Sequence, residues 1–146
     1  MTVKPGIGIN DIKFGMSESQ ILNLIGKPNK IVIDEDDEDK NRVYQYNELK
    51  LRLTFYNEYK GKLGYIRVAN PKIEVKGNLI IGIRIEDVFK SYGLSKENWN
   101  EEDYFTFNSY FNEKIWTTLN EEYGVVTDIE FGYLFDNSGE NPNWPK

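Results

Sequence analysis

The sequence predicts an α+β fold in which two tandem repeats, each a helix followed by three strands, form one curved antiparallel sheet with the helices on one face. Two glycine-bounded segments with helical periodicity recur in the two halves of the chain, and strand-like segments follow each of them. The boundary between the halves is expected within residues 70–78. The 146 residues are therefore predicted to be a single domain built of repeats 1–76 and 77–146.

The first helix is predicted over residues 17–25. Ser17 followed three residues later by Gln20 is a capping-box pattern, in which the hydroxyl and the amide satisfy backbone N–H donors at the helix start. Ile21, Leu24 and Ile25 then fall on one helical face at i, i+3 and i+4. Gly26 suits the left-handed position after a helix, and a proline two residues later cannot continue it.

The second helix is predicted from an apolar stripe at i, i+3, i+4 and i+7 that starts at Ile85 and is closed by Gly93. Each segment places two glycines eleven positions apart: Gly15 with Gly26, and Gly82 with Gly93. The repeat is imperfect, because Arg84 stands where the first segment has Ser17. The second helix start therefore lacks a side-chain acceptor.

Strands are predicted from alternation of apolar and polar residues. Residues 49–55 alternate leucine or phenylalanine with lysine, arginine and threonine, which is typical of a half-buried strand. Its predicted neighbours are 43–47 and 63–70, and the strands of the second half are 104–110, 114–119 and 127–135. Residues 57–61 and 120–124 are predicted turns.

The composition excludes several classes of protein. No apolar run approaches the length that spans a membrane, and the first ten residues do not resemble a signal peptide. The absence of cysteine excludes disulfides and thiolate chemistry, and cytoplasmic localisation is expected. The absence of histidine removes the commonest general base and the usual zinc sites. We therefore expect no enzyme, no metal and no cofactor.

Charge is distributed unevenly along the chain. Residues 1–76 carry 13 basic and 11 acidic side chains, whereas residues 77–146 carry 5 and 13, a net charge of −8. An acidic half repels nucleic acid and favours a basic partner, and we expect neither nucleic acid nor a membrane as a partner. The alternative interpretation is that the negative charge only keeps the protein soluble.

Alternation assigns the side chains of the predicted sheet to two faces. Toward the helices we expect Tyr44, Tyr46, Leu51, Leu53, Phe55, Ile66, Val68, Phe105, Phe107, Ile115, Leu119, Ile129 and Phe131. On the opposite face we expect Arg52, Tyr56, Tyr65, Arg67, Tyr104, Trp116, Asp128 and Glu130. Aromatic residues and arginine dominate interface energies, so this second set is a candidate binding surface. The alternative is that these are ordinary residues of amphipathic strands.

Three polar segments remain. The acidic run 34–39 lacks the glycine of a calcium loop and is predicted as a solvated hairpin loop that could touch a basic partner. Residues 97–103 combine a tryptophan with carboxylates, and are either a turn with that ring folded onto the core or an acidic edge of the interface. The candidate contacts there are Trp99, Glu101, Glu102 and Asp103. The tail 137–146 is expected to fray, unless Trp144 docks locally.

The segment Ile-Lys-Phe-Gly-Met-Ser at 12–17, followed by a short amphipathic helix and Gly-Lys-Pro-Asn at 26–29, resembles the start of a β-lactamase-inhibitor-protein-like module. The small lipoproteins of the outer-membrane assembly machinery share that module. The resemblance implies a curved sheet whose concave face grips a protein. Unlike secreted members, this sequence has no cysteine for lipidation or disulfides. Small acidic proteins with an aromatic-rich sheet are also similar to immunity proteins of bacterial toxin systems.

These observations together predict a protein-binding inhibitor, with an immunity protein that neutralises a basic nuclease toxin by tight binding as the first hypothesis. A non-catalytic structural or assembly module with a permanent partner is one alternative. A carrier of a small ligand between sheet and helices is another. High salt would slow association with a charged protein partner and leave an apolar ligand's binding almost unchanged.

Overall fold

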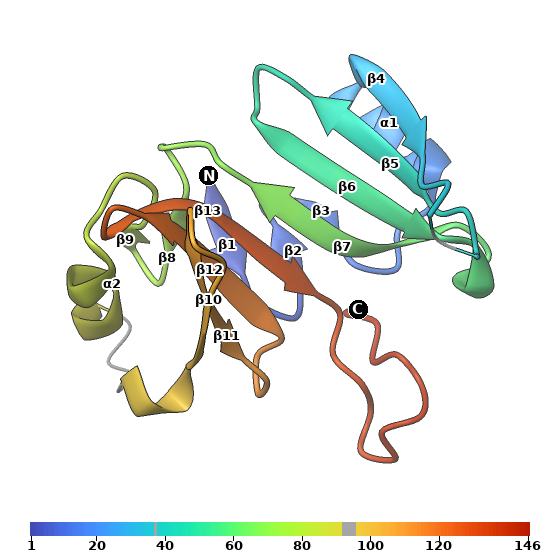
Figure 1. Ribbon diagram of the computed structural model, residues 1–146. Helices are drawn as coiled ribbons and strands as arrows, with labels where there is room; N and C mark the ends of the chain where they lie inside the picture. Colours follow the sequence, from blue (N-terminus) through green and yellow to red (C-terminus); the bar gives the residue numbers. More distant parts are fainter. Residues whose placement is uncertain (37, 92–95) are drawn as a thin grey trace.

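A computed structural model describes residues 1–36, 38–91 and 96–146. Figure 1 shows one long sheet crossing the molecule, with the remaining elements behind it or beside it. The elements of the long sheet are β4 (Lys30–Ile33), β5 (Arg42–Tyr46), β6 (Leu51–Tyr56), β7 (Lys62–Val68), β10 (Asn100–Asp103), β11 (Asn108–Asn112), β12 (Thr117–Glu122) and β13 (Val125–Gly132). Single turns of 3₁₀ helix, η1 (Asn57–Tyr59) and η2 (Lys96–Asn98), join neighbouring elements.

The eight strands of this sheet are all antiparallel and follow the order β10-β11-β12-β13-β7-β6-β5-β4. Each half is a meander of four consecutive strands, and the two meanders meet where β13 pairs with β7. Pairing at this seam places Glu130 opposite Arg67 and Phe131 opposite Ile66. Residues distant in the sequence thereby become neighbours at the centre of the sheet.

A second, five-stranded sheet and two helices make up the other layer. The small sheet contains β1 (Thr2–Lys4), β2 (Gly8–Ile9), β3 (Ile12–Lys13), β8 (Glu74–Val75) and β9 (Asn78–Leu79), in the order β3-β2-β1-β8-β9. Its only parallel pair among the described residues, β1 with β8, joins the chain's start to the linker between the two meanders. The helices are α1 (Glu18–Ile25) and α2 (Ile85–Ser91).

The second layer covers one face of the large sheet. On α1, Glu18 accepts hydrogen bonds from Arg42 Nε at 2.8 Å and from the Tyr44 hydroxyl at 2.7 Å, both on β5. In the turn after β3, Phe14 has its ring edge to face against Phe131 of β13, with centroids 5.6 Å apart. On α2, Phe89 lies against Tyr110 of β11, with centroids 5.4 Å apart. The core therefore runs from β5 to β11 on this side, and the edge strands β4 and β10 contribute no buried residue.

The first predicted helix is confirmed with its capping box. The Ser17 hydroxyl accepts from the Gln20 backbone N–H at 3.2 Å, and the Gln20 side chain accepts from the Ser17 backbone N–H at 2.8 Å. Gly26 follows with φ of 83°, a conformation that glycine adopts without strain. The predicted end of the second helix, at Tyr92 and Gly93, lies outside the described residues.

The prediction of one sheet made from two helix-plus-three-strand repeats is wrong. The chain forms two sheets, of five and eight strands, and each half contributes four strands rather than three to the large one. The strands of the small sheet have only two or three residues, too few for alternation to appear. At the two edges of the large sheet, β4 is an unbroken apolar run apart from its lysine, and β10 is polar throughout, so neither alternates.

Within the described residues no helix is long and apolar enough to cross a membrane.

Candidate partner-binding face

The face of the large sheet that points away from the second layer carries a row of directly paired residues. The row crosses all eight strands through Lys30, Gln45, Arg52, Arg67, Glu130, Thr118, Phe111 and Asn100. The residues flanking this row on the central strands, such as Leu53, Ile66 and Ile129, are fully buried beneath the second layer. Because side chains alternate along a strand, the row lies on the opposite side. We call this side the open face.

A network of polar side chains forms the centre of the open face. Asp128 accepts from Arg67 Nε at 3.0 Å and from the Asn120 amide at 2.8 Å. The same amide nitrogen donates to Glu130 at 2.7 Å, and Glu130 also accepts from the Tyr65 hydroxyl at 3.3 Å. The network joins β7, β13 and β12 side by side. It fixes two carboxylates and a guanidinium in place before any partner arrives.

Two aromatic rings of the open face lie directly against glycine residues of neighbouring strands. Trp116 is 39% exposed and packs edge to face against Phe111, with centroids 5.2 Å apart. A Cβ added to Gly132 would lie 2.9 Å from Trp116 Cδ1, so the indole lies directly on the backbone of β13. Tyr56 covers Gly64 of β7 in the same way. Both rings are held on the face and remain partly open to solvent.

The predicted position of Trp116 within a strand is wrong. It lies in the turn between β11 and β12, with φ of 47°, and β12 begins at the next residue. Tyr104 is also in a turn rather than a strand, because the segment 104–107 connects β10 to β11. Turn geometry nevertheless carries the Trp116 ring back over β13, onto the open face.

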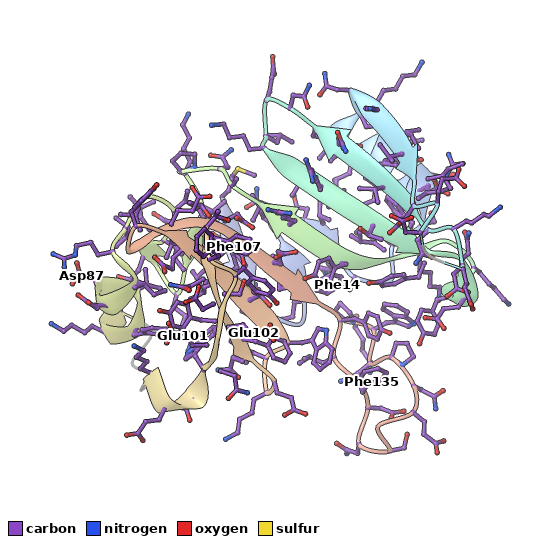
Figure 2. All side chains as sticks on the ribbon, viewed as in Figure 1. Phe14, Asp87, Glu101, Glu102, Phe107 and Phe135 are labelled. Carbon is purple, nitrogen blue, oxygen red and sulfur yellow. The ribbon has the colours of Figure 1, made fainter. Side chains whose placement is uncertain are left out.

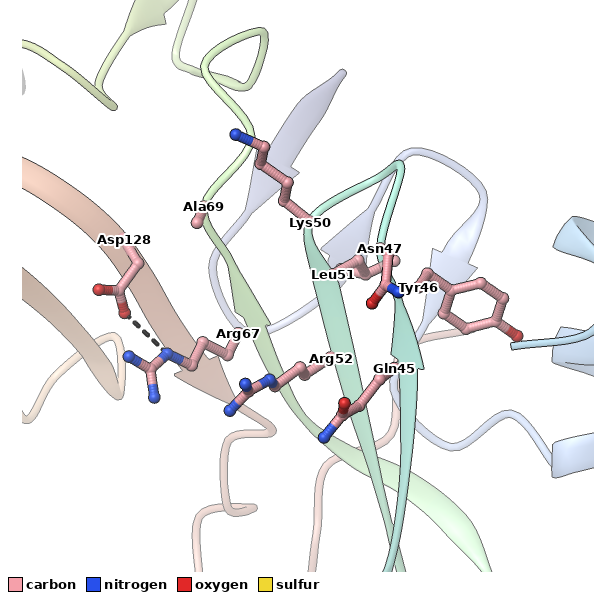
Figure 3. Close-up of a pocket in the computed structure, with 9 residues that line it drawn as sticks. All are labelled: Gln45, Tyr46, Asn47, Lys50, Leu51, Arg52, Arg67, Ala69 and Asp128. Carbon is pink, nitrogen blue, oxygen red and sulfur yellow. Dashed lines mark hydrogen bonds and ion pairs between the residues drawn. The ribbon is translucent and has the colours of Figure 1, made fainter. Parts of the chain in front are cut away.

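Three hollows in the open face differ in their chemistry. The acidic hollow, of about 550 Å³, lies over β10–β12 and reaches Glu130; it is lined by Asn100, Glu101, Glu102, Tyr104, Ser109, Phe111, Thr118 and Glu130. The aromatic hollow, of about 320 Å³, is lined by Asp39, Asn41, Tyr56, Glu58, Gly64, Tyr65, Trp116, Tyr133 and Phe135. The arginine hollow, of about 330 Å³, is lined by Gln45, Tyr46, Asn47, Lys50, Leu51, Arg52, Arg67, Ala69 and Asp128 (Figure 3).

The acidic hollow collects two carboxylates, Glu102 and Glu130, without a cation, and Glu101 at its border turns toward Tyr110 on the covered side of the sheet. In the described part of the chain, Glu101, Glu102 and Glu130 form no ion pair. Instead Glu102 accepts from the Tyr104 hydroxyl, and Glu101 accepts from the Tyr110 hydroxyl at 3.3 Å. Figure 2 shows Glu101, Glu102 and Phe107 grouped together on β10 and the turn that follows it. The hollow therefore offers negative charge to a cation from outside.

Several predicted site residues lie elsewhere. Trp99 is 4% exposed and its ring packs against Phe89 of α2, so of the two interpretations of 97–103 the one with this ring folded onto the core is correct. Asp103 is exposed, and it accepts from the Phe105 backbone N–H at 2.8 Å, which stabilises the turn. Phe105 was expected to face the helices, but it is 99% exposed at φ of 73° in that turn.

The two remaining segments also have defined places. The acidic run 34–39 joins β4 to β5, its described residues are exposed, and Asp37 lies outside the described residues. Trp144 docks, with its ring centroid 5.1 Å from that of Tyr133 and 5.7 Å from that of Tyr59. Lys62 Nζ lies 5.6 Å from the centre of the same indole. The C-terminal tail is therefore attached to the sheet near the aromatic hollow.

The sequence interpretation missed Asn120, Ser109, Phe111 and Lys50. Asn120 is the donor that links Asp128 to Glu130, and Ser109 donates to Asn120 at 2.5 Å. Lys50 lies at φ of 50° in the turn between β5 and β6 and lines the arginine hollow. Alternation within 117–122 places the Asn120 side chain on the face opposite to that of the buried Leu119. Its contact with Asp128 depends on the register between β12 and β13, which the sequence pattern does not give.

We expect the protein to become less stable at alkaline pH because of four tyrosines. Burial, as the first cause, raises the pKa of Tyr46 and of Tyr110 to about 12, and raises the pKa of Tyr65 and Tyr133 further. The unfolded chain ionises near pH 10, so these pKa shifts contribute stability below pH ~10 that is lost as pH rises through the folded-state values. Urea unfolding measured across that range, with tyrosinate absorbance of the folded protein, checks this. Ten tyrosines titrating together near pH 10 in the folded state would contradict it.

Replacing Gly64 with alanine is expected to destabilise the protein by roughly 1–2 kcal/mol. The added Cβ would lie 2.1 Å from Tyr56 Cδ2, so the ring must leave its place on β7. The measurement is urea unfolding of Gly64→Ala alone and combined with Tyr56→Ala. If displacement of the ring is the cause, the cost of the glycine substitution shrinks once Tyr56 is alanine. An equal cost in both backgrounds would place the strain in the backbone instead.

Comparison with known proteins finds similarity over only part of one relative's sequence. No family model matches the chain. Over 85 residues it is 33% identical to the E subunit of the V-type ATP synthase of Clostridium novyi (strain NT), a match that covers 52% of this chain and 42% of that protein. The chain thus spans less than half the length of this relative.

Two solved structures resemble the fold. One is an extracellular protein containing an SCP domain from Bacillus anthracis str. Ames, with a TM-score of 0.52 and 15% identity, covering 90% of this chain and 50% of that one. The other is a DUF4309 family protein, YjgB, from Bacillus subtilis subsp. subtilis str. 168, with a TM-score of 0.50 and 14% identity, covering 88% of this chain and 83% of that one. At these identities the likeness concerns the fold alone.

Proposed function

We propose that the protein binds another protein through the open face and inhibits it without catalysing a reaction. The partner that we propose is a basic toxin of the nuclease class, which makes this chain an immunity protein acting in the cytoplasm. The observation that carries the proposal is the acidic hollow beside Trp116 and Phe111. There, two carboxylates, Glu102 and Glu130, that no cation of the described residues neutralises lie beside an aromatic surface.

The chemistry of the hollow suits a basic protein. A lysine or arginine entering it would meet Glu102 and Glu130, and a charge-assisted hydrogen bond to a carboxylate is about twice as strong as a neutral one. Trp116 supplies a large, rigid apolar contact next to these charges. The polar network holds Glu130 in position, so little conformational entropy is lost on binding.

The experiment is a calorimetric titration of this chain with the toxin-domain protein encoded beside its gene. We expect tight binding and inhibition, and association that slows as salt screens the charges. A Glu130→Gln variant should associate more slowly than the parent, whereas Glu140→Gln, which removes an exposed carboxylate of the C-terminal tail, should not. A neighbouring gene that encodes a metabolic enzyme, with no toxin that binds, would contradict the proposal.

A non-catalytic assembly module is the second candidate. The likeness over 85 residues to a component of a V-type ATP synthase favours it, since that relative is by name one part of a larger assembly. The two candidates differ in whether the protein occurs alone. An assembly module would co-purify with its partner from cells in fixed ratio, whereas an immunity protein produced without its toxin would purify by itself.

A further inference from the structure

The arginine hollow lies in the same row as the acidic hollow and carries the opposite charge. Arg52 and Arg67 occupy directly paired positions on β6 and β7, and Lys50 stands at the end of β6. Figure 3 shows the two arginine side chains extending in the same direction across the hollow, with Lys50 above them. Asp128 is the single carboxylate among the lining residues. Two positive charges therefore remain unbalanced.

The direct pairing of two arginines does not help the protein to fold. Like charges directly opposite one another in a sheet repel, and Asp128 engages Arg67 through Nε, which leaves the terminal guanidinium nitrogens of Arg67 available as donors. Arg52 makes no hydrogen bond or ion pair with any described residue. Each guanidinium group is a planar fork of N–H donors that a carboxylate fits, and here two such groups with unused donors are neighbours.

We propose that the arginine hollow binds an acidic side chain of the partner protein, so that the partner is bipolar, with a basic patch over the acidic hollow and a carboxylate over Arg52 and Arg67. This inference rests on the proposed function. The row places both hollows on one continuous surface, with Glu130 directly paired to Arg67. A long polyanion such as nucleic acid would have to pass Glu130 and the acidic hollow, which repel it, whereas a single carboxylate reaches the arginines alone. A bipolar face also accepts its partner in one orientation.

The test uses the whole chain, labelled with nitrogen-15, and four probes: an acetylated tetraglutamate peptide, a tetralysine peptide, inorganic phosphate and a single-stranded oligonucleotide. We expect tetraglutamate to shift the Nε–H signals of Arg52 and Arg67 saturably. Arg52→Gln should weaken that binding at least fivefold, and the matched variant Arg84→Gln, an exposed arginine on the other layer, should change it less than twofold. Equal or stronger binding of phosphate or the oligonucleotide, or no shift with tetraglutamate, would overturn the proposal.

Two controls separate this inference from folding and from the proposed function. Arg52→Gln should leave the melting temperature unchanged or raise it, because it removes the repulsion with Arg67. A lowered melting temperature would assign Arg52 a structural role and overturn the proposal.

The second control uses the toxin partner, against which Arg52→Glu should weaken binding at least tenfold. If the partner binds and Trp116→Ala weakens it while Arg52→Glu does not, the inference fails and the proposed function stands. If tetraglutamate binds as expected and the toxin does not, the function fails.

Discussion

Replacing Trp116 with alanine is expected to weaken partner binding by about 2 kcal/mol or more, roughly 30-fold. The indole is held on the backbone of Gly132 and against Phe111, so its exposed surface is presented rigidly at the edge of both the acidic and the aromatic regions of the open face. A rigid aromatic ring that a partner covers completely is the kind of residue that dominates alanine scans.

The matched control is Tyr123→Asn. Tyr123 is another large aromatic residue in a turn, fully exposed, and it lines none of the three hollows described above. With φ of 53° before Gly124, its position suits asparagine, so the control should fold at least as well as the parent. Calorimetry against the toxin partner and thermal unfolding should be run on both variants. Normal binding by Trp116→Ala, together with early melting, would remove Trp116 from the binding site.

Replacing Arg67 with alanine is expected to lower the free energy of unfolding by about 2–3 kcal/mol. The Asp128 side chain is 8% exposed and Arg67 is its one cationic partner among the described residues. Without that guanidinium a nearly buried carboxylate remains, held by Asn120 and the hydroxyl of Thr127. Desolvation of the unpaired charge, more than the lost hydrogen bond, accounts for the expected cost.

The cause is tested by adding Asp128→Asn. Because the second substitution removes the unpaired charge, the double variant should regain about 1 kcal/mol or more of the free energy of unfolding relative to Arg67→Ala. Arg84→Ala is the matched control, because its ion pair with Glu86 is exposed on both sides and should be worth less than about 1 kcal/mol. Urea unfolding of the parent and these three variants gives the comparison. An Arg67 substitution no more costly than Arg84→Ala would show that the central network is not structurally important.

The elements that sequence predicted well are those whose local chemistry is complete within a few residues. The capping box of Ser17 and Gln20 and the glycine after it define α1 without reference to the rest of the chain. The alternation of residues 51–55 likewise matches β6, where Leu51, Leu53 and Phe55 are fully buried. One face of a strand is buried and the other is not, so the pattern survives in the sequence.

The elements it did not predict depend on distant partners. Thr2 and Val3 pair with Glu74 and Val75, and no local pattern indicates so long a connection. The edge strand β10 is exposed along its whole length, so its sequence carries no burial pattern at all. The acidic character of β10 is itself suited to an unpaired edge, because charge discourages pairing with another chain.

The candidate site was predictable in its faces and unpredictable in its details. Alternation assigns Arg52, Tyr65, Arg67, Asp128 and Glu130 to one face, and the paired row together with the polar network brings them together. The register that sets Arg67 beside Glu130 and Asp128 depends on how two halves of the chain dock, which is a long-range property. Trp116 and Tyr104 reach the hollows from turns, Trp116 with a positive φ, and alternation does not describe turns.

The most direct test of the open face as the binding surface is hydroxyl-radical footprinting of the chain with and without its toxin partner. We predict that the partner protects Trp116, Tyr104 and Phe111, which line the hollows, and leaves Leu24 and Leu79, exposed on the other layer, as reactive as in the free protein. Protection of Leu24 and Leu79, with Trp116 and Tyr104 unchanged, would contradict the account and place the binding surface on the helices and the small sheet.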